Sequence, residues 1–92
     1  DKEAYMLAVE YFKEMLSQGG VKPMIHHIIA QSYAKMKDFN NAILCEKQAI
    51  ETAKAAIAAG EHQGTITNST IKEYETALAG YEAQSGEFTD KS

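Results

Sequence analysis

Residues 24–50 constrain the fold of this chain more than any other stretch. Two sets of mostly apolar residues recur at steps of three and four positions and flank a short polar segment at residues 37–40. This spacing places each set on one face of an α-helix. The sequence therefore predicts two helices folded back on each other around a tight turn. The stripe before the turn comprises Ile25, Ile28, Ile29, Ser32, Tyr33 and Met36, and the stripe after it comprises Ala42, Ile43, Ala49, Ile50, Ala53 and Ile57.

The turn itself holds residues suited to joining two helices. Asp38 or Asn40 can cap the second helix, because a short side-chain oxygen accepts a bond from a free backbone N–H of the first turn. Phe39 is expected to fill the elbow between the helices. Lys35 and Lys37 place positive charge at the negative end of the first helix dipole. Local signals and apolar spacing thus predict the same hairpin.

This hairpin resembles the tetratricopeptide repeat, a helical hairpin of about 34 residues. The resemblance implies an α-solenoid built from antiparallel helical hairpins, and a role in binding other proteins. Two positions depart from the family pattern. His26 stands at an aromatic position, and Lys54 replaces the proline that commonly closes the repeat, so the second helix is expected to continue to Gly60. The residues that carry the resemblance are Ile29, Ala30 and Tyr33 on the first helix, Phe39 in the turn, and Ala42 and Ala49 on the second helix.

The period of the repeat recurs in the preceding part of the chain, which predicts its domain organisation. We expect one all-α, TPR-like domain of about four helices at residues 1–84, followed by a flexible tail at residues 85–92. Its parts are a half repeat at residues 1–22, a full repeat at residues 23–56 with an extended second helix, and a closing helix at residues 68–84. Because the chain opens inside a repeat and without methionine, we expect it to be a terminal piece of a longer protein. One period apart, Tyr5, Ala8, Phe12, Met15 and Leu16 align with Phe39, Ala42, Glu46, Ala49 and Ile50.

Further helix signals lie towards both ends of the chain. Residues 1–18 are predicted to form one helix that starts with acidic residues and stops at Gly19 and Gly20. The alanine-rich end of the second hairpin helix has a smooth surface, against which we expect the last helix to pack. Thr70 and Glu73 have the spacing of a capping box, which predicts a helix start there.

Composition agrees with an all-helical chain and excludes several classes of function. Of 92 residues, 45% are apolar, and only one proline interrupts stretches rich in Ala, Ile, Met, Glu and Lys. The basic residues number 9 and the acidic residues 13, which gives a net charge of −4 and no basic stripe. We therefore expect no nucleic-acid partner and no anionic membrane surface. No apolar run approaches the roughly 20 residues of a membrane span, and no signal peptide is visible.

The sequence contains no set of residues that indicates a catalytic or metal site. His26 and His27 are adjacent and point in different directions on a helix, and His62 lies in a distant loop. Cys45 lies within a helix, away from a helix start and a base, and is expected to be a packing or surface thiol. The carboxylates are scattered beside lysines, which predicts solvent-exposed faces. We therefore expect no enzyme activity, no metal and no cofactor.

The resemblance implies one candidate binding surface, on the first helix of the hairpin. In this family that helix lines a concave groove that receives an extended peptide or a helix. Relatives that grip a peptide's terminal carboxylate use Lys and Asn where this chain has His27 and Gln31, so binding of that type is not expected. The alternative is that the stripe is only the solvated side of an amphipathic helix. The predicted groove residues for a protein or peptide partner are Met24, His27, Gln31, Ala34 and Lys35.

A second candidate surface lies on residues 1–18. If this helix is half of a hairpin, part of its apolar face lacks a partner and is expected to bind a second copy, giving a homodimer. Alternatively, these residues pack on the helix that begins at Met24. A structural role in the assembly of a larger protein is therefore the second functional hypothesis. The candidate self-association residues are Tyr5, Ala8, Val9 and Phe12.

Overall fold

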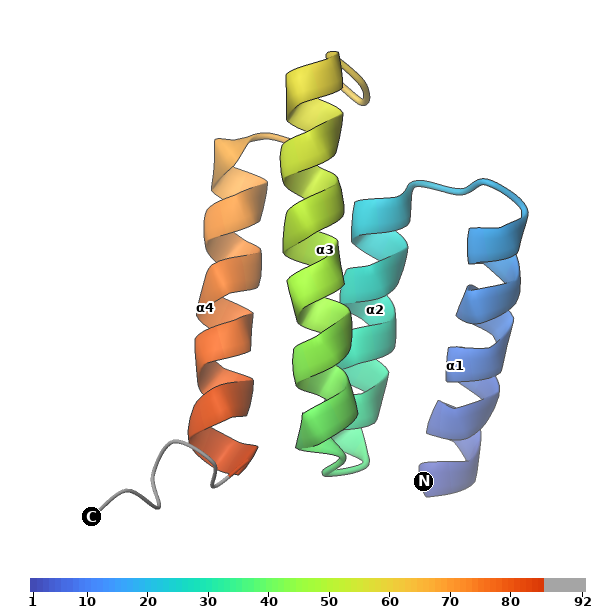
Figure 1. Ribbon diagram of the computed structural model, residues 1–92. Helices are drawn as coiled ribbons and strands as arrows, with labels where there is room; N and C mark the ends of the chain where they lie inside the picture. The colour runs from blue at the N-terminus through green and yellow to red at the C-terminus, as the bar shows by residue number, and fades with distance from the viewer. Residues whose placement is uncertain (86–92) are drawn as a thin grey trace.

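The computed structural model describes residues 1–85 and shows four α-helices (Figure 1). Helix α1 spans Lys2–Ser17, α2 spans Lys22–Lys35, α3 spans Phe39–Ala59 and α4 spans Asn68–Ser85. No strand occurs within the described residues, and the predicted all-α class is confirmed. Apart from Ser85, which ends α4, the predicted tail at residues 85–92 lies outside the described residues.

Each helix packs mainly against its neighbour in the chain. Helices α2 and α3 form the central hairpin, α1 packs on α2, and α4 packs on α3. Figure 1 shows α1 and α4 on opposite sides of this hairpin. The molecule is thin, with principal extents of 42 × 32 × 15 Å. Each of these pairs of packed helices therefore includes a helix of the central hairpin.

The core is divided into two clusters, one between α1 and α2 and one between α3 and α4. In the first, Val9 of α1 is buried with Ile25 and Ile29 of α2. In the second, the small side chains at the end of α3 leave room for the aromatic ring that α4 inserts. The prediction that the last helix packs on the alanine-rich end of α3 is confirmed. The buried members of this second cluster are Ala49, Ile50, Ala53, Ala56, Ile66 and Tyr74.

Three helices end in the same hydrogen-bonded turn, which has one residue in the left-handed conformation. That residue is Gly19 after α1, Lys37 after α2 and Gly60 after α3, with φ angles of 91°, 66° and 74°. In each turn the N–H of the following residue donates to a carbonyl of the last helical turn, at 3.3, 2.9 and 2.8 Å respectively. Glycine adopts this conformation freely, whereas the Cβ of Lys37 makes it unfavourable.

The starts of α3 and α4 differ in how well the sequence predicts them. Asp38 caps α3 as expected, since its Oδ1 accepts a bond from the N–H of Asn41 at 3.3 Å. Helix α4 begins at Asn68, so Thr70 lies inside its first turn instead of capping it. There the Oγ1 of Thr70 accepts a bond from the N–H of Thr67 at 3.1 Å. The capping role predicted for Thr70 is therefore wrong, because the helix starts before it.

Candidate functional site

A shallow groove with a volume of about 370 Å³ lies between α2 and α4, beside the start of α3. The groove includes three of the five residues that the sequence predicts for a partner-binding surface. The residues missed by sequence reasoning come from the turn and from α4. The lining consists of Gln31, Ala34 and Lys35 from α2, Lys37 and Phe39 from the turn and the start of α3, and Tyr81 and Gln84 from α4.

Two aromatic rings connect α4 to the start of α3 inside this groove. The rings of Phe39 and Tyr81 lie 6.4 Å apart between centroids, with 35° between their planes. Burial, followed by the negative charge of Glu46, raises the pKa of the Tyr81 hydroxyl. The phenol therefore stays uncharged at neutral pH and can donate or accept a hydrogen bond. Tyr81 has the helical spacing of a core residue, which is why the sequence alone does not reveal its place in the groove.

The lining of the groove is positively charged in a chain that carries net negative charge. Lys35 and Lys37 are both exposed, and no Asp or Glu lines the groove. Within residues 1–85, neither ammonium group lies within ion-pair distance of a carboxylate. The nearby carboxylate of Asp38 accepts bonds from the backbone and the side-chain amide of Asn41 instead. Both lysines are therefore available to a negatively charged partner.

The other two predicted groove residues lie outside this groove. Met24, in the first turn of α2, is 41% exposed and is not part of the lining. His27 turns towards α3, where its Nδ1 lies 2.7 Å from Oε2 of Glu46, and its side chain is only 13% exposed. Its ring also stacks on that of Tyr74, with centroids 4.3 Å apart and 19° between the planes. From its position on α2, His27 therefore contacts both α3 and α4.

Glu46 lies at the centre of this contact and has no exposed surface. Its Oε2 meets His27, whereas its Oε1 is buried without a hydrogen-bond partner in the described part of the chain. Burial raises the pKa of the Glu46 carboxyl, the hydrogen bond and charge of His27 lower it, and the charge of Glu73 raises it. The prediction that the carboxylates occupy solvent-exposed faces is wrong for Glu46. A signal was available in the sequence, because Glu46 continues the buried stripe formed by Ala42, Ala49, Ile50 and Ala53.

The candidate self-association face of α1 is used largely inside the chain. Val9 is 1% exposed, and with the partly buried Phe12 it packs on α2. Tyr5 and Ala8 are also partly buried. This arrangement is the alternative in which the apolar face of α1 packs on the following helix. A homodimer through the remainder of this face stays a prediction.

Two of the large apolar residues that α1 exposes, Leu7 and Tyr11, lie on its other side. Leu7 and Tyr11 are each 63% exposed, and Met6 is 40% exposed. Leu7 and Tyr11 are separated by one helical turn, so they share one face. Sequence reasoning missed them because the longer apolar stripe of this helix is the one that packs on α2.

The remaining titratable residues form no metal cluster within residues 1–85. No three His, Cys, Asp or Glu side chains in this range are arranged to hold a metal ion. Burial, followed by the positive charge of Lys22, lowers the pKa of His26. Burial raises the pKa of Cys45, which lies beside Lys13 and Leu16 of α1, so the group is a thiol at neutral pH.

Among the helices of residues 1–85, none combines the length and the apolar character that crossing a membrane requires.

Comparisons with known proteins supply no relative from which a function can be transferred. No protein-family model, curated protein sequence or solved structure matches the chain. The tetratricopeptide resemblance therefore stays a prediction from the residues, and the functional evidence lies in the groove itself.

Proposed function

We propose that this chain is a protein–protein interaction module, a TPR-like scaffold that presents the groove to a peptide or a partner domain. The observation that carries the proposal is the concave surface formed by Gln31, Ala34 and Lys35 together with side chains of the turn and α4. Its volume of about 370 Å³ falls within the range of about 300–1,000 Å³ that protein ligand sites occupy.

The chemistry of the lining favours binding over catalysis. Phe39 and Tyr81 offer apolar ring surface, while the amides of Gln31 and Gln84 can bond to a peptide backbone. The lysine ammonium groups can pair with acidic side chains of a partner. Because the lining does not pair an acid with a base, it supports recognition instead of a chemical step.

The test is a peptide selected from a displayed random library for binding to the 92-residue chain. The exposed groove residues are then replaced together, as Gln31→Ala, Lys35→Ala and Gln84→Ala. We expect the dissociation constant to rise about tenfold or more, since tenfold corresponds to only about 1.4 kcal/mol. The matched control replaces three exposed residues of α3, as Lys47→Ala, Gln48→Ala and Lys54→Ala. Equal binding by the groove variant and the control would count against the groove.

A second candidate function is structural, as a segment that assembles a larger protein through α1. The observation that favours it is the exposure of Leu7 and Tyr11, because exposed large apolar side chains grouped on one face mark interaction surfaces. This face differs from the one formed by Tyr5, Ala8, Val9 and Phe12, which the sequence predicts.

A further inference from the structure

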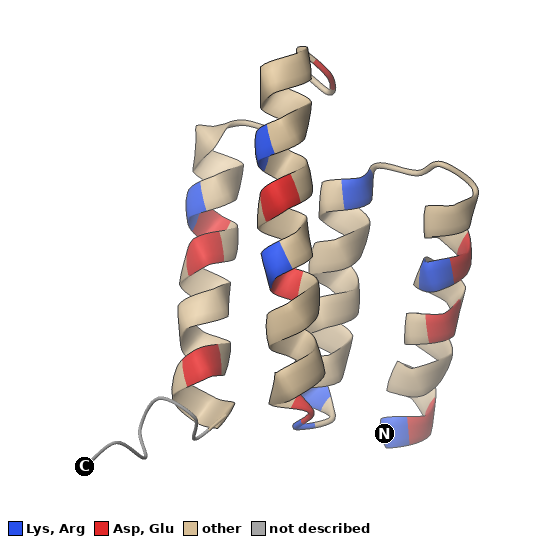
Figure 2. Cartoon of the chain, in the orientation of Figure 1, with Lys and Arg blue, Asp and Glu red and all other residues tan. Residues whose placement is uncertain are grey.

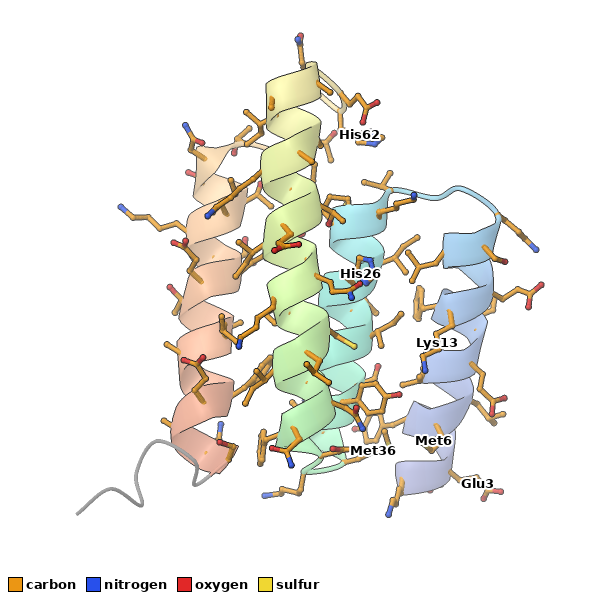
Figure 3. All side chains as sticks on the ribbon, viewed as in Figure 1. Glu3, Met6, Lys13, His26, Met36 and His62 are labelled. Carbon is orange, nitrogen blue, oxygen red and sulfur yellow. The ribbon has the colours of Figure 1, made fainter. Side chains whose placement is uncertain are left out.

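The outer face of α1 combines apolar and acidic side chains. Leu7 and Tyr11, each 63% exposed, are accompanied by the exposed Glu3, Glu10 and Glu14 at helical steps of three and four. Figure 2 shows acidic segments on the side of α1 turned away from α2. In Figure 3 the labelled side chain of Glu3 points away from α2. This face therefore presents two large side chains beside three negatively charged ones.

The side of α1 that faces α2 carries a basic side chain beside its apolar residues. Lys13 points towards α2 in Figure 3, and its Nζ donates to the hydroxyl of Tyr33 at 3.3 Å. The same ammonium lies 5.8 Å from the centre of the Tyr33 ring. These contacts hold α1 on α2 with the acidic outer face turned to solvent.

The groove between α2 and α4 is complementary in charge to this outer face. It carries Lys35 and Lys37 without a carboxylate, it contains the rings of Phe39 and Tyr81, and it is concave where α1 is convex. Complementary charge sets the orientation of docking partners and speeds their encounter. Apolar side chains entering the groove would supply burial, which is the larger contribution to association.

We propose that this groove receives the outer face of α1 from a second copy of the chain, an inference that rests on the proposed function and names its partner. Leu7 and Tyr11 of one copy lie over Phe39 and Tyr81 of the next, and the glutamates face the two lysines. The α1 helix of the same copy does not reach this groove, because it lies on the opposite side of the central hairpin from α4 (Figure 1).

The two surfaces are different, so the contact is heterologous. In a pair joined by one such contact, one copy keeps an unused groove and the other keeps an unused α1 face, and both can bind further copies. The assembly therefore grows into rings or chains of copies instead of stopping at a symmetric dimer.

The experiment is light scattering of the full chain over a range of concentrations, at low and at high salt. We expect the average mass to rise with concentration beyond that of a dimer, and to fall when salt screens the charges. Lys35→Glu with Lys37→Glu reverses the charge of the groove, and Glu10→Lys with Glu14→Lys reverses that of α1. Each double variant alone is expected to stay monomeric, while a mixture of the two regains association. All four positions are exposed, and circular dichroism checks that both variants keep their helices.

The control is Lys47→Glu with Lys54→Glu, which makes the same charge change on exposed positions of α3 and should associate like the unmodified chain. Three results would overturn the proposal: a monomer at every concentration, association that ends at a dimer, or a mixture that stays monomeric. If the chain is monomeric but the groove substitutions weaken the binding of a selected peptide, this inference fails and the proposed function stands. If the groove variant changes neither the binding of a selected peptide nor the association of the chain, the proposed function fails together with this inference.

Discussion

Lys37 has a backbone conformation that glycine has at the matching ends of α1 and α3. Replacing it, as Lys37→Gly, removes the contact between Cβ and the backbone that disfavours a positive φ. We expect the free energy of unfolding to rise by about 0.5–1 kcal/mol, measured by urea denaturation. The reverse change at the end of α3, Gly60→Ala, should lower it by about 1 kcal/mol. If both variants unfolded at the same urea concentration as the unmodified chain, the positive φ at these two turns would have no effect on the free energy of unfolding.

Among the helical elements, α3 buries Ala42 in its first turn, and this residue has no exposed surface. Ala42→Leu adds carbons where the hairpin has no room, so we expect a loss of about 1–3 kcal/mol in the free energy of unfolding. Ala58→Leu, at an exposed position of the same helix, is the size-matched control and should unfold nearly like the unmodified chain. An unchanged denaturant midpoint for Ala42→Leu would mean that the helices do not cross closely at this residue.

The contact between α3 and its neighbours at Glu46 predicts how stability depends on pH. Burial raises the pKa of the Glu46 carboxyl above its ordinary value of 4.5, so the folded chain binds this proton more tightly than the unfolded chain. The stabilisation that this tighter proton binding gives to the folded chain is complete below about pH 4.5. It is lost as the pH rises through the pKa of Glu46 in the folded chain. The groups that face Glu46 are His27 from α2 and Glu73, Tyr74 and Tyr81 from α4.

We therefore expect the contribution of Glu46 to the free energy of unfolding to grow as the pH falls from neutral towards 4.5. Glu46→Gln keeps the size of the side chain and removes its titration, so its stability curve should lack this gain. Glu51→Gln, an exposed position on the same helix, should keep the gain. Parallel curves for the unmodified chain and Glu46→Gln, recorded by thermal unfolding across this pH range, would contradict the expected linkage.

Sequence reasoning succeeds at the scale of the helices because apolar spacing and turn residues act locally. Asp38 caps α3, and the long α3 ends at Gly60, where a positive φ is required. It fails where a residue's environment depends on packing between helices. Glu46 is a charged residue type but lies in the buried stripe, where its Oε2 meets His27 of α2, whose ring stacks on Tyr74 of α4. Four of the seven residues that line the groove were missed, and two of these, Tyr81 and Gln84, join it only when α4 packs on α3.

At the scale of the whole molecule, the arrangement of helices predicts an uneven resistance to unfolding. Helices α2 and α3 are each packed on two sides, whereas α1 and α4 lie at the edges. In chains of stacked helices, stability depends on contacts between neighbours, so edge elements open with less loss of contact. We expect backbone amides of α2 and α3 to exchange with deuterium more slowly than those of α1 and α4 in dilute protein. Equal exchange rates in all four helices would indicate a single cooperative unit.

Cys45 is the single cysteine of the chain, and it lies partly buried beside Lys13 and Leu16 of α1. A maleimide dye added to the unmodified protein therefore attaches at one position without any engineered residue. Because α1 lies beside this sulfur, the labelling rate is expected to rise when α1 moves away from the central hairpin. The thiol of Cys45 can thus report on the position of α1, the helix that we propose binds a second copy.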